Sequence, residues 1–173
     1  MATGIIAVRP KIPGDKRKTV LWHQDSHYFG QDAASHRIIT AWLPLVNTDE
    51  TNGYMRVIPG SHQWGYQQAE MDEEHHAYRP LEGPSLRGDV VECPMRVGDV
   101  LIFNNLLMHC SGANTSDHIR WSVDFRYLSP QVQFERLRDF LPGFLARSRS
   151  TPDTVDDWPT WKRRMENFRE ASA

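Results

Sequence analysis

Two imidazoles and a carboxylate occupy alternating positions in LWHQDSHYFG, residues 21–30. The flanking residues predict a strand that runs into a turn, and alternate side chains of a strand point to the same face. We therefore expect His23, Asp25 and His27 to lie on one face of this segment. Such a face can be a solvated polar surface, a hydrogen-bond network or part of a metal site.

A second histidine far along the chain would complete a metal-binding set. His109 follows GDVLIFNNLLM and precedes the turn CSGANTSD, so it lies just after a predicted strand. Two imidazoles and one carboxylate occupy one face of an octahedral metal and leave three positions open, as in non-haem Fe(II) oxygenases. His23, Asp25 and His109 are therefore candidate catalytic metal ligands. The alternative is a buried hydrogen-bond cluster or a degenerate site.

A candidate carboxylate-binding pair follows the third histidine. Arg120 comes soon after His109, and Ser122 lies two residues further on the same strand face. A guanidinium group binds a carboxylate through two parallel hydrogen bonds, and a hydroxyl can add a third. The chain thus offers a metal triad followed by a site for the distal end of a dicarboxylate.

The strand that carries Arg120 alternates strictly. In IRWSVDFRY, residues 119–127, apolar side chains alternate with the polar side chains Arg120, Ser122, Asp124 and Arg126. The ordinary interpretation is an apolar face on the core and a polar face in water. The alternative is that the polar face lines the inside of a barrel and binds a polar ligand. The alternation by itself leaves both open.

Short stretches rich in β-branched and aromatic residues, with turn residues between them, predict most of the fold. They lie at 4–9, 19–24, 37–45, 54–60, 89–94, 98–105 and 119–128. Regular short strands of this kind indicate an all-β sandwich or barrel. We expect residues 65–88, which are highly charged, to form a long surface loop that contributes to specificity. We expect the C-terminal segment, 131–173, to form helices that pack on the sheet.

Composition excludes several classes of function. The chain has 173 residues, enough for one domain, and a net charge of only −2, which indicates neither a nucleic-acid partner nor an anionic membrane surface. No apolar run approaches the ~20 residues of a membrane-spanning helix, and the first residues lack a signal-peptide pattern. Two cysteines, Cys93 and Cys110, suit a reducing compartment, most simply the cytoplasm. The oligomeric state is left open.

Five stretches of the chain resemble the phytanoyl-CoA dioxygenase family of Fe(II)- and 2-oxoglutarate-dependent oxygenases. They are HQDSHYF (23–29), AWLPL (41–45), NGYMRVIPGSH (52–62), GDVLIFNNLLMHCSGAN (98–114) and IRWSVDFRY (119–127). The resemblance implies a double-stranded β-helix, the jelly-roll or cupin-like fold. It implies that His23, Asp25 and His109 bind iron and that Arg120 binds the C5 carboxylate of 2-oxoglutarate. It also places Gln24 and Trp42 next to this co-substrate, with Ser111 and Ser122 as further contacts.

The activity that the resemblance implies is hydroxylation of a C–H bond in a small organic substrate. The reaction would use Fe(II), 2-oxoglutarate and O₂ and release succinate and CO₂. We expect one oxygenase domain over 1–173, with its core at 19–128, that lacks the family's usual N-terminal portion.

Two other classes of protein remain open on the sequence. A catalytically incomplete jelly-roll module that binds or regulates is favoured by the short N-terminus. Another cupin-type metalloenzyme, using Zn²⁺ or Mn²⁺, would have no need of Arg120 and Ser122. Among the remaining histidines, His27 is expected to be structural, with a contact to the metal ligands or to the substrate as the alternative. His62 is expected to stabilise its turn, and His75 and His76 are expected to be solvated.

Overall fold

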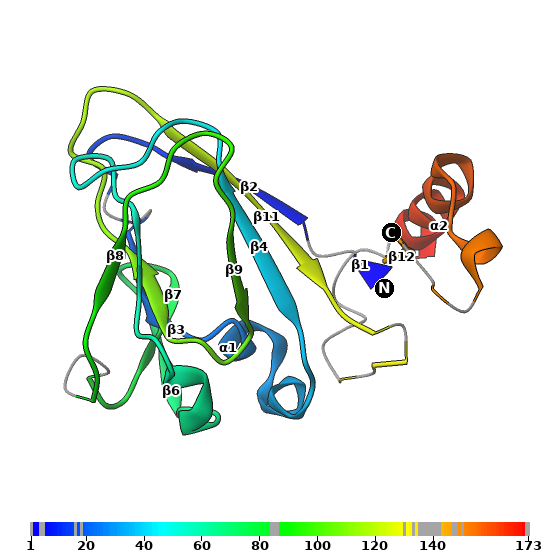
Figure 1. Ribbon diagram of the computed structural model, residues 1–173, viewed down its shortest axis with the longest axis horizontal. Coiled ribbons are helices and arrows are strands. Elements are labelled where there is room, and N and C mark those ends of the chain that lie inside the picture. The colour runs from blue at the N-terminus through cyan, green and yellow to red at the C-terminus, as the bar shows by residue number, and fades with distance from the viewer. Residues whose placement is uncertain are drawn as a thin grey trace.

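Two four-stranded antiparallel sheets face one another and form a double-stranded β-helix (Figure 1). This computed structural model describes residues 2–3, 6–15, 17, 19–83, 87–129, 131–132, 134, 143–146, 149 and 151–171. Most neighbouring strands in each sheet are far apart in the chain, because the chain crosses from one sheet to the other at each step from β2 to β5 and again from β8 to β11. The predicted all-β jelly roll is confirmed.

One sheet has the strand order β2-β11-β4-β9. These strands are β2 (Ile6–Lys11), β11 (Arg120–Tyr127), β4 (Ile39–Pro44) and β9 (Leu101–Asn104). The register places Arg120 opposite Lys11 and Asp124 opposite Trp42. Side chains from adjacent strands therefore meet on the same face of the sheet.

The other sheet has the strand order β3-β10-β5-β8. These strands are β3 (Val20–His23), β10 (His109–Ser111), β5 (Met55–Val57) and β8 (Val91–Cys93). In the register His109 is the partner of His23, although the two residues are far apart in sequence. Strand pairing thus brings the two histidines side by side.

The polar face of β11 points into the barrel and its apolar face points outward. Arg120 is only 3% exposed, whereas the adjacent Trp121 is 40% exposed. Ser122, Asp124 and Arg126 are buried in the same way. Of the two interpretations of this alternating strand, the structure shows the second, in which the polar face lines the lumen.

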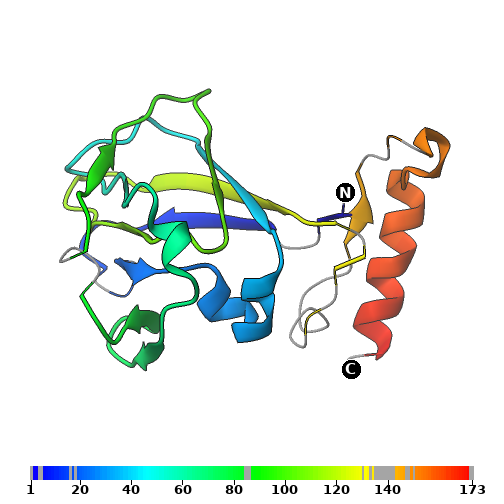
Figure 2. The same cartoon turned by 60° about the horizontal axis from the view of Figure 1, so that its bottom comes forward.

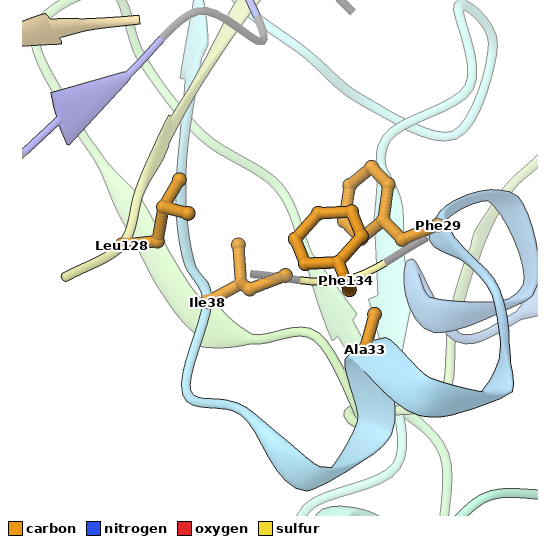
Figure 3. Packing of buried hydrophobic residues seen from close by; sticks show 5 residues of the cluster. All are labelled: Phe29, Ala33, Ile38, Leu128 and Phe134. Carbon is orange, nitrogen blue, oxygen red and sulfur yellow. The ribbon is translucent and has the colours of Figure 1, made fainter. Parts of the chain in front are cut away.

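One apolar cluster of the core lies at the end of the barrel that carries the short helices α1 (Ser26–Phe29) and η2 (Gln31–Ser35). Figure 3 shows this cluster, which comprises Phe29, Ala33, Ile38, Leu128 and Phe134. Asn105 ties the same region together, because its amide donates to Ser26 Oγ at 2.8 Å and to the Ala33 carbonyl at 3.0 Å. The first turn after His23 is thereby fixed.

Residues 65–88 are not the structureless loop that we expected. They contain a hairpin, β6 (Ala69–Asp72) and β7 (Ala77–Pro80), which follows the 3₁₀ turn η3 (Ser61–Trp64). The hairpin is stabilised by charged cross-strand contacts such as Arg79 to Glu70 at 2.6 Å. Such an exposed two-stranded ribbon carries polar residues on both strands, so the usual apolar alternation is absent.

The C-terminal part stands beside the barrel. Strand β1 (Ala2–Thr3) pairs with β12 (Phe144–Leu145), and η6 (Pro152–Thr154) precedes α2 (Trp158–Ala171). Helix α2 lies next to this strand pair and not over either four-stranded sheet (Figure 2). The expected C-terminal helix is therefore present, but its packing differs from the prediction. Most of PQVQFERLRDFL, residues 130–141, the first part of the C-terminal segment expected to be helical, falls outside the described residues.

In the part of the chain described here, no helix combines the length and the apolar character needed to cross a membrane.

Gly53→Ala is expected to destabilise the fold more than Gly60→Ala. Both glycines have φ +80°, where a side chain costs about 1–2 kcal/mol. At Gly53 a Cβ would also lie 2.5 Å from the Gly112 carbonyl oxygen, whereas at Gly60 nothing lies within 4 Å. The added overlap should cost a further ~1–3 kcal/mol. Urea unfolding of both variants measures the difference, and equal losses would contradict the close approach.

Candidate metal centre

The segment that begins the site is a strand that ends at His23. Asp25 is the N-cap of α1, and His27 lies within that helix. The three side chains therefore do not share a strand face, and the expectation that His27 points to the same side as His23 and Asp25 along a strand is wrong. The His27 ring contacts the Gln67 carbonyl through Nε2 at 2.9 Å, and its Nδ1 accepts from the backbone N–H of Gln24. His27 ties the turn to the chain around Gln67.

His23, Asp25 and His109 converge. The Nε2 atoms of both histidines lie 3.9 Å from Asp25 Oδ1, and the three candidate ligand atoms all lie within 4.8 Å of one another. All three residues are buried. The cross-strand pairing of β3 with β10 supplies the histidines, and the turn after β3 supplies the carboxylate.

Both imidazoles are prepared for ligation through Nε2. The Nδ1 of His23 lies 2.8 Å from the Leu21 carbonyl oxygen, and the Nδ1 of His109 lies 2.9 Å from that of Leu107. A carbonyl oxygen only accepts, so each Nδ1 carries the proton and each Nε2 presents a lone pair. Burial, together with the proximity of the two rings, lowers the pKa of His23, and burial lowers the pKa of His109. Both are neutral at physiological pH, as metal ligation requires.

Asp25 is held by two partners that the sequence did not identify. Its Oδ2 accepts from Thr40 Oγ1 at 2.6 Å and from Arg126 Nε at 3.1 Å. Its Oδ1, which faces the histidines, accepts from Arg126 Nη2 at 3.1 Å. Burial alone would raise the pKa of Asp25, but the Arg126 guanidinium and the neighbouring imidazoles hold it well below its usual range. The carboxylate is therefore ionised and fixed in orientation.

Arg126 also binds Asp124, which continues the network toward the barrel mouth. The Arg126 Nη1 donates to Asp124 Oδ2, and Asp124 Oδ1 accepts from Arg9 Nε at 2.5 Å. Two guanidinium groups thus balance two carboxylates. Burial lowers the pKa of Arg126, whereas the charges of Asp25 and Asp124 raise it. The effect of the two carboxylates is the larger one, so the pKa of Arg126 is raised.

Arg120 reaches into the same cavity without a carboxylate partner among the described residues. Its Nη1 donates to Ser122 Oγ at 3.1 Å, and its guanidinium carbon lies 5.4 Å from the Trp42 ring centre. Its Nε is buried and has no hydrogen-bond partner among the residues that the structure describes. Burial lowers the pKa of Arg120 to about 10, so the group is charged at neutral pH. An anion placed here would satisfy both the charge and the unpaired Nε.

Lys11 is a second buried cation in the same cavity, opposite Arg120 in the sheet. Its Nζ donates to Ser111 Oγ at 2.8 Å and to the Gly112 carbonyl at 2.5 Å. Burial, with the nearby Arg120 charge, lowers the pKa of Lys11 to about 7.

Replacing Lys11 by methionine is expected to flatten the rise of stability with pH above neutrality. Lysine in the unfolded chain titrates near 10.4, so between about pH 7 and pH 10 the unfolded state binds more protons at this position. Stability of the wild type should therefore rise with pH there, by up to ~1.4 kcal/mol per unit from this group. Urea unfolding of both proteins at pH 7, 8 and 9 gives the difference in slope, and parallel curves would contradict the lowered pKa.

The cavity has a volume of about 640 Å³ and contains most of the residues singled out above. His23, Asp25, His109, Trp42, Ser111 and Arg120 all line it. Arg17, Thr19, Val20, Tyr28, His75 and His76 line it as well. The hairpin β6–β7 thus contributes to the cavity wall through its turn, where His76 has φ +49°.

Some residues that the sequence singled out lie elsewhere. Gln24 does not reach the cavity, because its amide donates to the carbonyls of Gly65 and Leu106 and accepts from the backbone N–H of Gln67. Its role is to fasten these segments to the turn. His62 is exposed, and the turn that it was expected to stabilise is held by Ser61, whose Oγ accepts from the Met108 backbone N–H.

Four residues of the site were missed, and only some of them left a signal. Asp124 and Arg126 share the polar face of Arg120 and Ser122, so the interpretation that turned this face inward already implied them. Lys11 lies in the basic stretch RPKIPGDKRK, whose charged side chains would be predicted to lie in solvent. The sequence around Thr40 contains no pattern that distinguishes this residue from the others in its strand.

The fold and this donor set define a class: cupin-like double-stranded β-helix proteins with a facial arrangement of two histidines and one carboxylate in the barrel. The chain belongs to the phytanoyl-CoA dioxygenase family, because the family model described as Phytanoyl-CoA dioxygenase (PhyH) matches residues 2–122. The resemblance found in the sequence is thereby confirmed.

Individual relatives are consistent with this family. The chain is 28% identical over 137 residues to peroxisomal phytanoyl-CoA dioxygenase of Mus musculus, covering 75% of this chain and 39% of the relative. It is 30% identical over 154 residues to 1-deoxypentalenic acid 11-beta-hydroxylase of Streptomyces exfoliatus, covering 78% and 53%. The chain therefore spans about half or less of the length of these relatives.

A solved structure with the same fold is the non-heme alpha ketoglutarate dependent carbocyclase SnoK from nogalamycin biosynthesis. The TM-score is 0.56 at 26% sequence identity, and the match covers 82% of this chain and 57% of SnoK.

Proposed function

We propose that this chain carries the active site of an Fe(II)- and 2-oxoglutarate-dependent oxygenase that hydroxylates a C–H bond of a small organic substrate. The observation that carries the proposal is the convergence of His23 Nε2, His109 Nε2 and Asp25 Oδ1 in a cavity that also holds the guanidinium of Arg120, whose Nε has no hydrogen-bond partner among the described residues. The names of the hydroxylase relative and of the alpha ketoglutarate dependent SnoK support it.

The described residues fit a ferrous ion. Two neutral imidazoles with protons on Nδ1 and one ionised carboxylate are the facial donor set of non-haem iron, and they leave three positions open. Iron, 2-oxoglutarate and O₂ together would supply the oxidising power, with release of succinate and CO₂. Asp25 Oδ2 accepts two hydrogen bonds, from Thr40 and Arg126, whereas Oδ1 accepts one from Arg126 and lies 3.9 Å from both histidine Nε2 atoms, so Oδ1 is the oxygen that would bind the metal.

The chain's own residues position and shield the reaction. Arg120 would bind the distal carboxylate of 2-oxoglutarate, with Ser122, Ser111 and Trp42 around it. Tyr28 and the turn of the β6–β7 hairpin line the cavity wall on which a small-molecule substrate would rest. A single domain in a reducing, cytoplasmic setting belongs to the same proposal, and the free thiols of Cys93 and Cys110 support it.

Anaerobic titration tests the proposal. Fe(II) followed by 2-oxoglutarate is expected to produce the weak visible charge-transfer band of the chelate, and air should then give succinate in the presence of a suitable small substrate. A protein that binds iron and 2-oxoglutarate but never forms succinate would be a binding module. A protein that binds Zn²⁺ or Mn²⁺ and gives no chelate band would be a different cupin-type enzyme.

A further inference from the structure

The wall of the cavity carries more positive charge than negative charge. Its arginine and lysine side chains are Arg9, Lys11, Arg17, Arg120 and Arg126. Asp25 and Asp124 are the only carboxylates among the described residues of the wall. Arg17 contacts Asp15, which lies outside the wall, at 3.0 Å. With that pair set aside, the basic side chains of the wall still outnumber the acidic ones.

Iron and 2-oxoglutarate would not remove this excess. A ferrous ion and a 2-oxoglutarate dianion carry equal and opposite charges, so the two together add no net charge to the cavity. Asp25 and Asp124 are already matched by Arg126. Positive charge that remains in a concave site with low-dielectric walls attracts anions from solution. The charge of the loaded site therefore favours a substrate that is itself an anion.

Arg9 is the cation best placed to meet such a substrate. Its side chain lines the cavity and is 49% exposed, whereas that of its partner Asp124 is 2% exposed. Nε donates to Asp124 Oδ1 at 2.5 Å and Nη2 donates to Oδ2 at 3.3 Å. Within the described part of the chain, these bonds use two of the five N–H groups of the guanidinium. Arg9 is thus oriented by a buried carboxylate and keeps donors for a ligand that enters from solvent.

The rest of the wall suits a molecule that has an apolar part as well as a charge. Val20, Phe29 and Phe103 line the same cavity as Arg9. Its volume of about 640 Å³ lies within the usual range for small-molecule sites, which combine apolar walls with a few polar groups that fix the orientation of the ligand.

We propose that the substrate of this site is a small organic anion, whose oxyanion group binds Arg9 while its apolar part extends toward the metal centre. Arg9 is then a residue that determines substrate specificity, and neutral analogues of the substrate are selected against. The inference rests on the proposed function and deepens it.

The test compares two dyes that share one aromatic framework. One is 8-anilinonaphthalene-1-sulfonate, and the other is N-phenyl-1-naphthylamine, which lacks the sulfonate. Each is titrated under argon into protein loaded with Fe(II) and 2-oxoglutarate, so that the place of the co-substrate is filled, and affinity is read from dye fluorescence. Arg9→Met is expected to weaken the sulfonate about tenfold, because a charge-assisted contact is lost. The affinity for the neutral dye should stay within about twofold of the wild type.

A surface arginine and two further substitutions sharpen the comparison. Arg79→Met removes an arginine of similar exposure, 55% against 49%, that pairs with Glu70 outside the cavity wall, and it should leave both affinities unchanged. Arg9→Lys keeps the charge and should bind the sulfonate within about threefold of the wild type. Should Arg9→Met not fold, Arg9→Gln, which can still donate to Asp124, carries the same test.

The outcomes separate this inference from the proposed function. A wild type that forms no chelate band with Fe(II) and 2-oxoglutarate defeats the proposed function. A wild type that forms the band but does not bind the sulfonate, or loses it when 2-oxoglutarate is added, defeats only the inference. The inference also fails if Arg9→Met weakens both dyes equally, since Arg9 would then only shape the cavity, or if it weakens neither.

Discussion

His109→Ala is expected to abolish the Fe(II)–2-oxoglutarate chelate and all turnover. His109 supplies one of three converging ligand atoms, and among the described residues no further histidine, cysteine or carboxylate joins this group. Loss of even an outer-shell partner of a metal site costs about ten- to hundredfold in affinity, and loss of a ligand should exceed that. Calorimetry with Fe(II) under argon and the visible chelate band measure the effect.

Two other histidines serve as controls for this variant. His118→Ala removes an exposed imidazole that pairs with Asp117, and His27→Ala removes a buried one from the same motif as His23. Both should retain the chelate band, although His27→Ala loses its bond to Gln67. A His109→Ala protein that still binds Fe(II) as tightly as these controls would refute the metal centre.

Arg126→Met should destabilise the metal-free protein by about 3–5 kcal/mol. Arg126 is the partner of two buried carboxylates, Asp25 and Asp124, and its removal leaves buried charge uncompensated. Methionine keeps the length of the side chain, so the loss is mainly electrostatic. Fe(II) affinity should fall about ten- to hundredfold as well, because Asp25 loses the group that orients it.

A surface arginine provides the matched comparison. Arg79 contacts Glu70 at 2.6 Å on the β6–β7 hairpin, where both side chains are about half exposed. Arg79→Met should cost no more than ~1 kcal/mol and leave iron binding unchanged. Unfolding in urea with a chelator present ranks the two variants. Equal stabilities would show that the Arg126 network contributes little to the fold.

The sequence predicted the strands well, because each has the β-branched and aromatic content of a half-buried pleated surface. Within the two four-stranded sheets it missed β10, which is only three residues long, with the sequence HCS, so its place in the sheet depends on pairing with β3 and β5. The β6–β7 hairpin was missed for a related reason, since its exposed strands carry charges where an apolar pattern would have given a signal.

For the candidate site, residue type and spacing identified groups that the structure does bring together, namely His23, Asp25, His109 and Arg120. Spacing could not tell where a side chain goes once the strand ends. Gln24 and His27 stand in the same motif as Asp25, yet both turn toward the backbone around residues 65–67. Lys11 enters the cavity only because β2 pairs with β11, which no local pattern reveals.

The inward-facing charges of β11 have a consequence for anyone who redesigns this protein. A hydropathy scale would recommend valine or leucine at Ser122 and Asp124, because those positions are buried, and serine or lysine at the exposed Trp121. The first pair of changes would remove the polar lining around which the chemistry is arranged. On this strand the buried positions are the ones that must stay polar. A design method that rewards apolar residues at every buried position would therefore remove the polar lining of the cavity.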